Sequence, residues 1–167
     1  MLFRSKKNSG PSVCRNHGIE ASSSEYIIIL DDDDELLKDA SEIIVNRLEN
    51  FPEKTKYPVC QFAHSTGFLN TPFKVIDLSK SCNGEAKGDF LPVINREIFI
   101  GKGLQYPQNR GGAESILWWQ IADTYGIPTW SDVVTRVNAD GCNRLTSVEN
   151  QIENPRQYAD IQETVIG

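Results

Sequence analysis

Four consecutive aspartates, Asp31 to Asp34, directly follow the apolar segment of residues 26–30. That segment is apolar or β-branched at nearly every position, which is typical of a strand buried on both faces of a helix-covered sheet. Ligands of open α/β sheets bind beyond the carboxyl ends of the strands. Carboxylates two positions apart can converge on one hard cation, and Mg²⁺ or Mn²⁺ so held keeps coordination positions for substrate phosphates. The acidic run therefore predicts a site for a divalent metal ion, and that ion would bridge the protein and a substrate diphosphate.

A purely structural role is the alternative for the same run. Asp34 can cap the helix expected after it, Asp32 and Asp33 would favour the positive end of the helix dipole, and Asp31 would be solvated. However, four adjacent like charges at the end of a buried strand repel one another and gain little from one helix dipole. We therefore favour the metal site over the helix cap.

Strands and helices alternate around the aspartates. Hydrophobic periodicity, glycine and proline predict strands over residues 25–30, 57–65, 73–78, 90–94 and 128–137. The same features predict helices over residues 12–21, from Asp34 to Asn50, as a short turn over 96–100, and over 114–125. Residues 79–87 are expected to form a polar loop and residues 101–112 a functional Gly- and Pro-rich loop. We expect an α/β fold with a mixed, mostly parallel sheet flanked by helices.

Length and composition indicate one domain. The 167 residues, 39% of them hydrophobic, suffice for a single core over residues 1–167. The polar stretch over residues 139–167 is expected to be a loosely packed tail. A formal charge of −6 repels phosphates over the surface as a whole, so nucleic acid is excluded as a partner.

Cysteine spacing and hydropathy indicate in which cellular compartment the protein is expected. The four cysteines lie far apart without a Cys-x-x-Cys pair, which predicts reduced, mostly buried thiols in a cytoplasmic protein and no zinc site. The longest apolar run is too short to cross a bilayer, and no secretion signal follows the basic first residues. We expect no transmembrane segment, while peripheral association at the inner face of a membrane stays open.

Three short motifs together resemble a known family. They are Cys14-Arg15-Asn16-His17-Gly18, Ser24-Glu25-Tyr26-Ile27 and Leu30-Asp31-Asp32-Asp33-Asp34. Their order and spacing are similar to the Ala-Arg-Asn-x-Gly, Gly-Glu-Tyr-Ile and Leu-Asp-x-Asp-Asp series of the family 2 inverting glycosyltransferases, which have the GT-A fold. The resemblance continues faintly from Gly88 to Arg96 and from Gly111 to Glu114.

The resemblance implies roles for the acidic and helical residues. It places Asp31 near the ribose of a nucleoside-diphosphate sugar and makes Asp33 the ligand of Mg²⁺ or Mn²⁺. Arg15 and Asn16 match positions that line or support the nucleotide, and Asp32 is grouped with these donor-binding positions. The implied acceptor is a glycan or a lipid-linked sugar, as in the synthesis of cell-envelope polysaccharides.

The general base is where the sequence departs from the family pattern. The family usually has Glu-Asp at the start of the late helix, with the aspartate as proton acceptor, whereas this chain has Glu114-Ser115. Serine cannot accept the proton at neutral pH without a partner. Glu114 is therefore the candidate base, which would deprotonate the acceptor hydroxyl as it attacks the anomeric carbon. The alternative is a carboxylate that only stabilises a helix start.

Several other side chains are candidates for the site. Trp118 and Trp119 could stack on a sugar, but at least one of them is expected in the core because they lie on an amphipathic helix. His64, at the end of a predicted strand, is assigned no role. Candidate diphosphate contacts are the guanidinium groups of Arg96, Arg110 and Arg136.

Three hypotheses follow. A complete domain of this family opens with a strand, a helix and a second strand ending in a base-binding aspartate, and none of these is recognisable before Ser12. We expect this chain to lack that nucleotide-binding edge, so that a fuller chain or an oligomer supplies it. The first hypothesis is that the chain is a truncated part of a glycosyltransferase. The second is that it is a non-catalytic remnant or a metal- and nucleotide-binding module. The third is that it is a nucleotidyltransferase.

Overall fold

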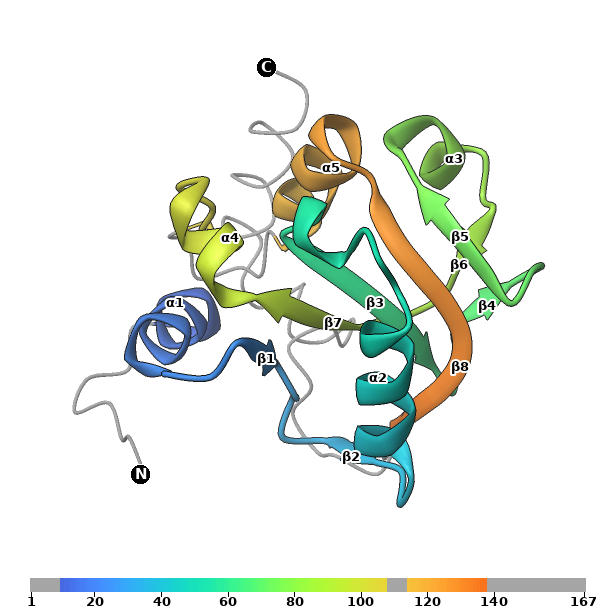
Figure 1. The fold of residues 1–167 in the computed structure, drawn as a ribbon, viewed down its shortest axis with the longest axis horizontal. Coiled ribbons are helices and arrows are strands. Elements are labelled where there is room, and N and C mark those ends of the chain that lie inside the picture. Colours follow the sequence, from blue (N-terminus) through green and yellow to red (C-terminus); the bar gives the residue numbers. More distant parts are fainter. Residues whose placement is uncertain (1–9, 108–113, 138–167) are drawn as a thin grey trace, which may run out of the picture.

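The computed structural model describes residues 10–107 and 114–137, so the expected tail lies outside the described residues. Figure 1 shows a central sheet with helices on both faces. The helices are α1 (Pro11–Ala21), α2 (Ala40–Glu49), the 3₁₀ helix η1 (Lys54–Lys56), α3 (Leu78–Cys82), α4 (Arg96–Gly101) and α5 (Glu114–Thr124). The strands are β1 (Tyr26–Ile28), β2 (Asp34–Leu36), β3 (Val59–His64), β4 (Phe68–Leu69), β5 (Phe73–Ile76), β6 (Ala86–Lys87), β7 (Phe90–Asn95) and β8 (Ile127–Val137).

The α/β class, with a mixed sheet flanked by helices, is confirmed, but the sheet is not mostly parallel. Its strand order is β1-β7-β3-β8-β2, and β5 also pairs with β8. The pairing of β3 with β8 is parallel, whereas β7 runs antiparallel to β1 and β3, and β2 and β5 run antiparallel to β8. Consequently β1, β3 and β8 point in one direction, and their carboxyl ends share one edge of the sheet.

The link between β1 and β2 requires the sheet to curl. These strands occupy opposite ends of the strand order, yet only residues 29–33 connect them. Fully extended, such a link spans roughly 20 Å, about the width of five flat strands. Because part of this link forms a hydrogen-bonded turn, it cannot be fully extended. The link crosses the edge of the sheet where β3 and β8 end and β7 begins, and it carries Asp31, Asp32 and Asp33 there (Figure 1).

Asp34 does not cap a helix, so that part of the sequence interpretation is wrong. Asp34 opens β2 and pairs with Val137, and the helix begins only at Ala40. The pairing partner of β2 lies about a hundred residues later in the chain, so local helical periodicity could not reveal it. The predicted polar loop at residues 79–87 likewise contains most of α3 and all of β6.

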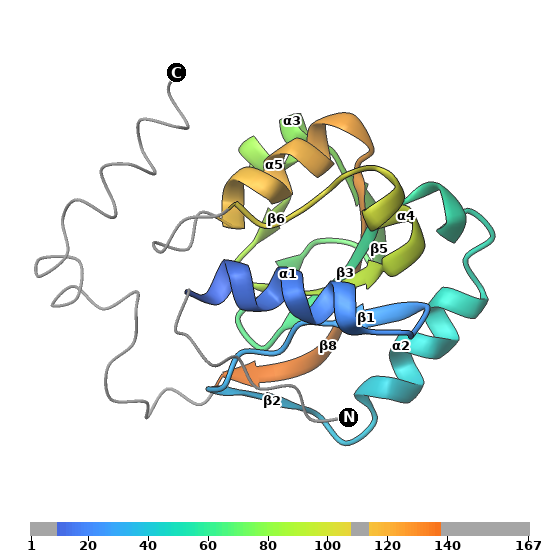
Figure 2. The same cartoon turned by 90° about the vertical axis from the view of Figure 1, so that its left-hand side faces the viewer.

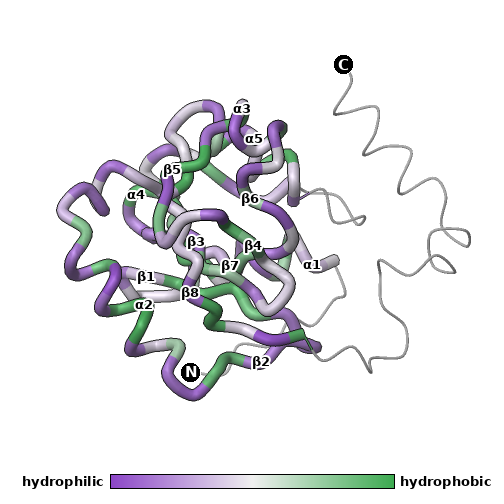
Figure 3. The backbone as a smooth tube through the Cα atoms, turned by 90° about the vertical axis from the view of Figure 1, so that its right-hand side faces the viewer, coloured by the Kyte–Doolittle hydropathy of each residue, from purple (hydrophilic) through white to green (hydrophobic). Residues whose placement is uncertain are grey.

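The two faces of the sheet bury separate apolar clusters. On one face, α1, α4 and α5 pack over a cluster that includes Ile19, Ile94, Phe99 and Ile121. On the other face, α2 covers a second cluster formed by Ala40, Ile44, Leu48, Cys60, Phe62, Leu91, Val93, Trp130 and Val134. Figure 2 shows α1 lying across the first face, and Figure 3 shows hydrophobic stretches of backbone along the central strands.

Two of the three cysteines in the described residues are exposed, contrary to the expectation of mostly buried thiols. Cys60 is buried in the second cluster, and burial raises the pKa of its thiol to about 12. Cys14 and Cys82 are free and exposed. Among the described residues, no helix is long and apolar enough to cross a membrane.

Candidate functional site

The four aspartates form a tight turn rather than a helix start. The backbone N–H of Asp34 donates to the carbonyl oxygen of Asp31 at 3.1 Å, which closes a β-turn. Asp31 and Asp32 are exposed, whereas Asp33 and Asp34 are half-buried. The turn lies at the edge of the sheet where β1, β3 and β8 end. Ligands of open α/β sheets bind beyond the carboxyl ends of strands, so this is the edge where a ligand is expected.

Arg15 joins the acidic turn to the start of α5. Its Nη2 atom lies 2.5 Å from Asp31 Oδ1, and its Nη1 atom donates to the carboxylate of Glu114, 99 residues away in sequence. The side chain of Arg15 is only 13% exposed. Burial by itself would lower the pKa of Arg15, but the two carboxylates outweigh it and the pKa is raised. The structure therefore brings together three residues that the sequence had proposed separately.

Burial sets the acidity of Glu114. It raises the pKa of this carboxyl above its ordinary value, against the opposing effect of Arg15 and with a smaller contribution from Asp31. A carboxylate with a raised pKa is a stronger proton acceptor than an ordinary glutamate. Glu114 is thus held beside the acidic turn in a form suited to general-base chemistry.

Asn16 fixes the loop that packs beneath Arg15. Its Nδ2 atom donates to the carbonyl oxygen of Tyr106 at 2.9 Å, and its Oδ1 atom accepts from the N–H of Tyr106 at 2.8 Å. The Tyr106 ring lies 5.5 Å from the Arg15 guanidinium carbon and packs edge-on against Trp118. Asn16 therefore supports Arg15 through Tyr106, which is a positioning function. Tyr106 carried no recognisable signal in the sequence.

Replacing Asn16 by alanine is expected to destabilise the protein by about 1–3 kcal/mol, because both backbone groups of Tyr106 lose a partner in a part-buried position. Asn70→Ala is the matched control, since Asn70 is exposed in a loop. Urea unfolding measures both changes. Equal free energies of unfolding for the two variants would show that the paired hydrogen bonds contribute nothing.

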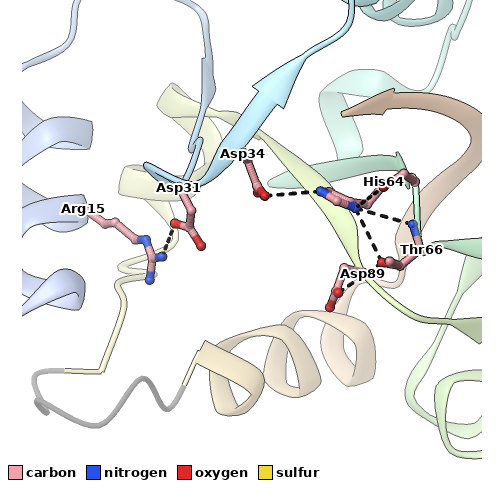
Figure 4. A network of polar contacts seen from close by, with 7 residues as sticks. Arg15, Asp31, Asp34, His64, Thr66 and Asp89 are labelled. Carbon is pink, nitrogen blue, oxygen red and sulfur yellow. Dashed lines mark hydrogen bonds and ion pairs between the residues drawn. The ribbon is translucent and has the colours of Figure 1, made fainter. Parts of the chain in front are cut away.

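A second polar group lies on the other side of the acidic turn. His64, at the end of β3, is 3% exposed, and its Nε2 atom lies 3.4 Å from Asp34 Oδ1. The Nδ1 atom of the same ring lies 3.5 Å from the N–H of Thr66, and Thr66 Oγ1 donates to Asp89 Oδ2 at 3.2 Å. Figure 4 shows this group facing the Arg15–Asp31 pair across the turn. The sequence interpretation assigns His64 no role, although it recognises the position of His64 at a strand end.

Two of the three arginines considered as diphosphate contacts, Arg96 and Arg136, have protein partners elsewhere. Arg96 donates to the carbonyl oxygens of Ile19 and Glu20 at 3.0 Å each, so it caps the end of α1. Arg136 pairs with Glu35 at 2.7 Å on the surface. Arg110 and the segment from Gly111 to Ala113 lie outside the described residues.

The two tryptophans of α5 differ in environment. Trp118 is partly buried and packs against the first core cluster without belonging to its fully buried residues. Trp119 is 40% exposed.

The acidic turn suits a hard cation whose coordination is completed by phosphate. Within residues 10–107 and 114–137, no group of three or more His, Cys, Asp or Glu side chains could hold a metal by itself. Mg²⁺ is commonly bound through one or two carboxylates plus substrate phosphates, for which the turn offers enough oxygen donors. Burial raises the pKa of Asp34, His64 opposes the rise, and the nearby charges of Asp33 and Asp31 add to it.

Comparison with protein families places part of the chain in a known family. Residues 2–103 match the sequence model of the family described as Glycosyl transferase family 2. The matched range covers more than half of the chain and includes Arg15, Asn16, the acidic turn, His64 and Asp89, while Glu114 lies beyond it. No curated protein matches the chain.

Proposed function

Because the chain belongs to glycosyl transferase family 2, we propose that it transfers a sugar from a nucleoside-diphosphate sugar to a glycan or lipid-linked acceptor, with inversion at the anomeric carbon. The observation that carries this proposal is the Arg15 bridge. It holds the candidate donor residue Asp31 and the candidate base Glu114 on one guanidinium, although they come from distant parts of the chain.

Glu114 is the proposed proton acceptor. The acceptor hydroxyl attacks the anomeric carbon from the face opposite the departing diphosphate, and Glu114 takes the hydroxyl proton as the new bond forms. A single displacement of this kind inverts the anomeric configuration. Arg15 restricts the orientation of this carboxylate, because its rigid guanidinium binds Glu114 through Nη1 and Asp31 through Nη2. Asn16, through Tyr106, keeps Arg15 in place.

Asp33 is the proposed ligand of Mg²⁺ or Mn²⁺, with Asp31 and Asp32 on the donor side of the turn. When bound, the cation would neutralise charge that develops on the departing diphosphate. The carboxylates of the turn would bind that cation and would keep the donor oriented toward Glu114.

Calorimetry with Mn²⁺ and uridine-diphosphate sugars tests the donor site. Wild-type protein is expected to bind the nucleotide sugar only with the metal, and Asp33→Ala is expected to weaken binding at least about a hundredfold, because a direct ligand contributes at least as much as outer-shell partners. Asp123→Ala, at an exposed position of α5, is the control and should bind like wild type.

The outcomes separate the three hypotheses. Metal-dependent binding with release of nucleoside diphosphate in the presence of acceptor supports a glycosyltransferase. Binding without turnover supports a non-catalytic module. Release of pyrophosphate from a nucleoside triphosphate and a sugar 1-phosphate would instead identify a nucleotidyltransferase, and absence of all binding would contradict a donor site in this chain.

A further inference from the structure

The environment of His64 determines which ring nitrogen carries the proton. The N–H of Thr66, 3.5 Å from Nδ1, can only donate, so Nδ1 accepts and a neutral ring keeps its proton on Nε2. The hydroxyl oxygens of Ser65 and Thr66 lie 3.3 Å and 3.5 Å from the same Nδ1 atom. Nε2 is buried and makes no hydrogen bond in the described part of the chain, and it lies 3.4 Å from Asp34 Oδ1. The Nε2 side of the buried ring therefore faces the Asp34 carboxylate at the end of the acidic turn.

The backbone around His64 leaves its ring little freedom. The N–H of His64 donates to the carbonyl of Asp89 at 3.1 Å, and its own carbonyl accepts from Gly67 at 2.8 Å. A side chain at Gly67 would overlap the carbonyl oxygen of Asp89, so the two loops touch backbone to backbone. The His64 side chain is only 4% exposed in this setting. The histidine is thus the fixed partner, and the carboxylate of Asp34 is the group that adjusts to it.

Asp34 transmits that constraint to the aspartates before it. The backbone N–H of Asp34 donates to the carbonyl oxygen of Asp31 and so closes the turn. Asp34 also pairs with Val137 of β8. One end of the turn is tied to Arg15 through Asp31, at 2.5 Å. The other end is tied to β3 through Asp34 and His64 (Figure 4). Asp32 and Asp33 lie between these two points of attachment.

We infer that His64 is a positioning residue, whose Nε2–H orients the Asp34 carboxylate and thereby fixes the acidic turn Asp31–Asp34 in the conformation that receives the metal and the diphosphate. The role of the turn in receiving metal and diphosphate rests on the proposed function, whereas the contact between His64 and Asp34 does not depend on it. His64 touches neither donor nor acceptor; it acts through Asp34.

Three substitutions separate a positioning role from simple packing. His64→Gln keeps an N–H near the Nε2 position, His64→Asn keeps polarity but does not reach Asp34, and His64→Phe fills the volume without a donor. In calorimetry with Mn²⁺ and uridine diphosphate, His64→Phe and His64→Asn are expected to bind Mn²⁺ about 10–100-fold more weakly than wild type. His64→Gln is expected within about threefold of wild type, because it restores the donor.

A double-mutant cycle with Asp34→Asn checks that the effect passes through Asp34. The loss in the double variant should be close to that of the larger single loss, because both changes break one interaction. Additive losses, or a glutamine variant as weak as the phenylalanine variant, would overturn the inference. If His64→Phe fails to fold, the glutamine and asparagine variants decide the matter.

Amide hydrogen exchange of the Asp34 N–H in the ligand-free protein distinguishes this inference from the proposed function. His64→Asn should speed exchange on the order of tenfold and His64→Gln should not, since only the former releases the turn. If wild type binds no Mn²⁺ but this exchange pattern holds, His64 positions the turn and the donor-site proposal fails. Unchanged exchange in His64→Asn would refute the positioning role itself.

Discussion

Replacing Glu114 by glutamine is expected to lower the rate of sugar transfer by about 10²–10⁴-fold, because the amide cannot accept the proton of the attacking hydroxyl. The fold should persist, since glutamine can still accept a hydrogen bond from Arg15, and Arg15 keeps its second partner, Asp31. Release of nucleoside diphosphate from the donor, measured in the presence of acceptor, reports the rate. Donor binding measured by calorimetry should stay near wild type.

The pH dependence of the transfer rate tests the same assignment of Glu114 as the base. A base must be deprotonated to act, so the transfer rate falls as pH falls through the pKa of Glu114. Burial raises that pKa above the ordinary glutamate value of 4.5, so the acidic limb should lie above pH 4.5. Arg15 opposes the rise, and Arg15→Gln should therefore move the limb to still higher pH.

Glu97→Gln is the matched control for Glu114→Gln. Glu97 also lies in the first turn of a helix, α4, but is exposed there. Its replacement should leave both the rate and the acidic limb unchanged. A rate for Glu114→Gln within about threefold of wild type would show that another group accepts the proton and that Glu114 only stabilises the start of α5.

Gly88→Ala is expected to destabilise the protein by about 3–5 kcal/mol. Gly88 has φ +75°, a conformation that strains any residue with a β-carbon, and that carbon would overlap the carbonyl oxygen of Thr66. The obstacle is backbone, so it cannot move away as a flexible side chain would. Relief requires the loop that carries Asp89 to separate from the loop that follows His64.

Gly18→Ala is the contrasting substitution in the same experiment. Gly18 lies inside α1, its backbone is helical, and a β-carbon there would meet no atom within 4 Å. Alanine should stabilise the protein by about 0.5–1 kcal/mol through its higher helix propensity. Urea unfolding measures both variants. A Gly88→Ala protein as stable as wild type would mean that the two loops are not in backbone contact.

Local patterns predicted the elements that depend on neighbouring residues. The helix around Arg15 and Asn16 and the helix that starts at Glu114 lie where proline, glycine and apolar spacing predict them, and the apolar segment before Asp31 forms a strand. The family resemblance, which also depends on residues close in sequence, is confirmed by the match over residues 2–103.

Interactions between distant segments were not predictable in the same way. Asp34 satisfies the rules for a helix cap, but β8 offers its backbone a strand partner, and the strand is what forms. The expectation of a mostly parallel sheet was wrong for the same reason. Strands that pair antiparallel, such as β1 and β7, lie far apart in the sequence, so no local pattern indicates their direction.

By itself, then, the sequence singled out the residues that we propose for the site: the acidic turn, Arg15, Asn16 and Glu114. Only the tertiary structure decided that Arg15 bridges Asp31 and Glu114 and that His64 faces Asp34. The physical reason is that helix and turn preferences act over a few residues, whereas ion pairs and buried rings depend on how a curled sheet brings strand ends together. That geometry is a property of the whole core, and no short segment contains it.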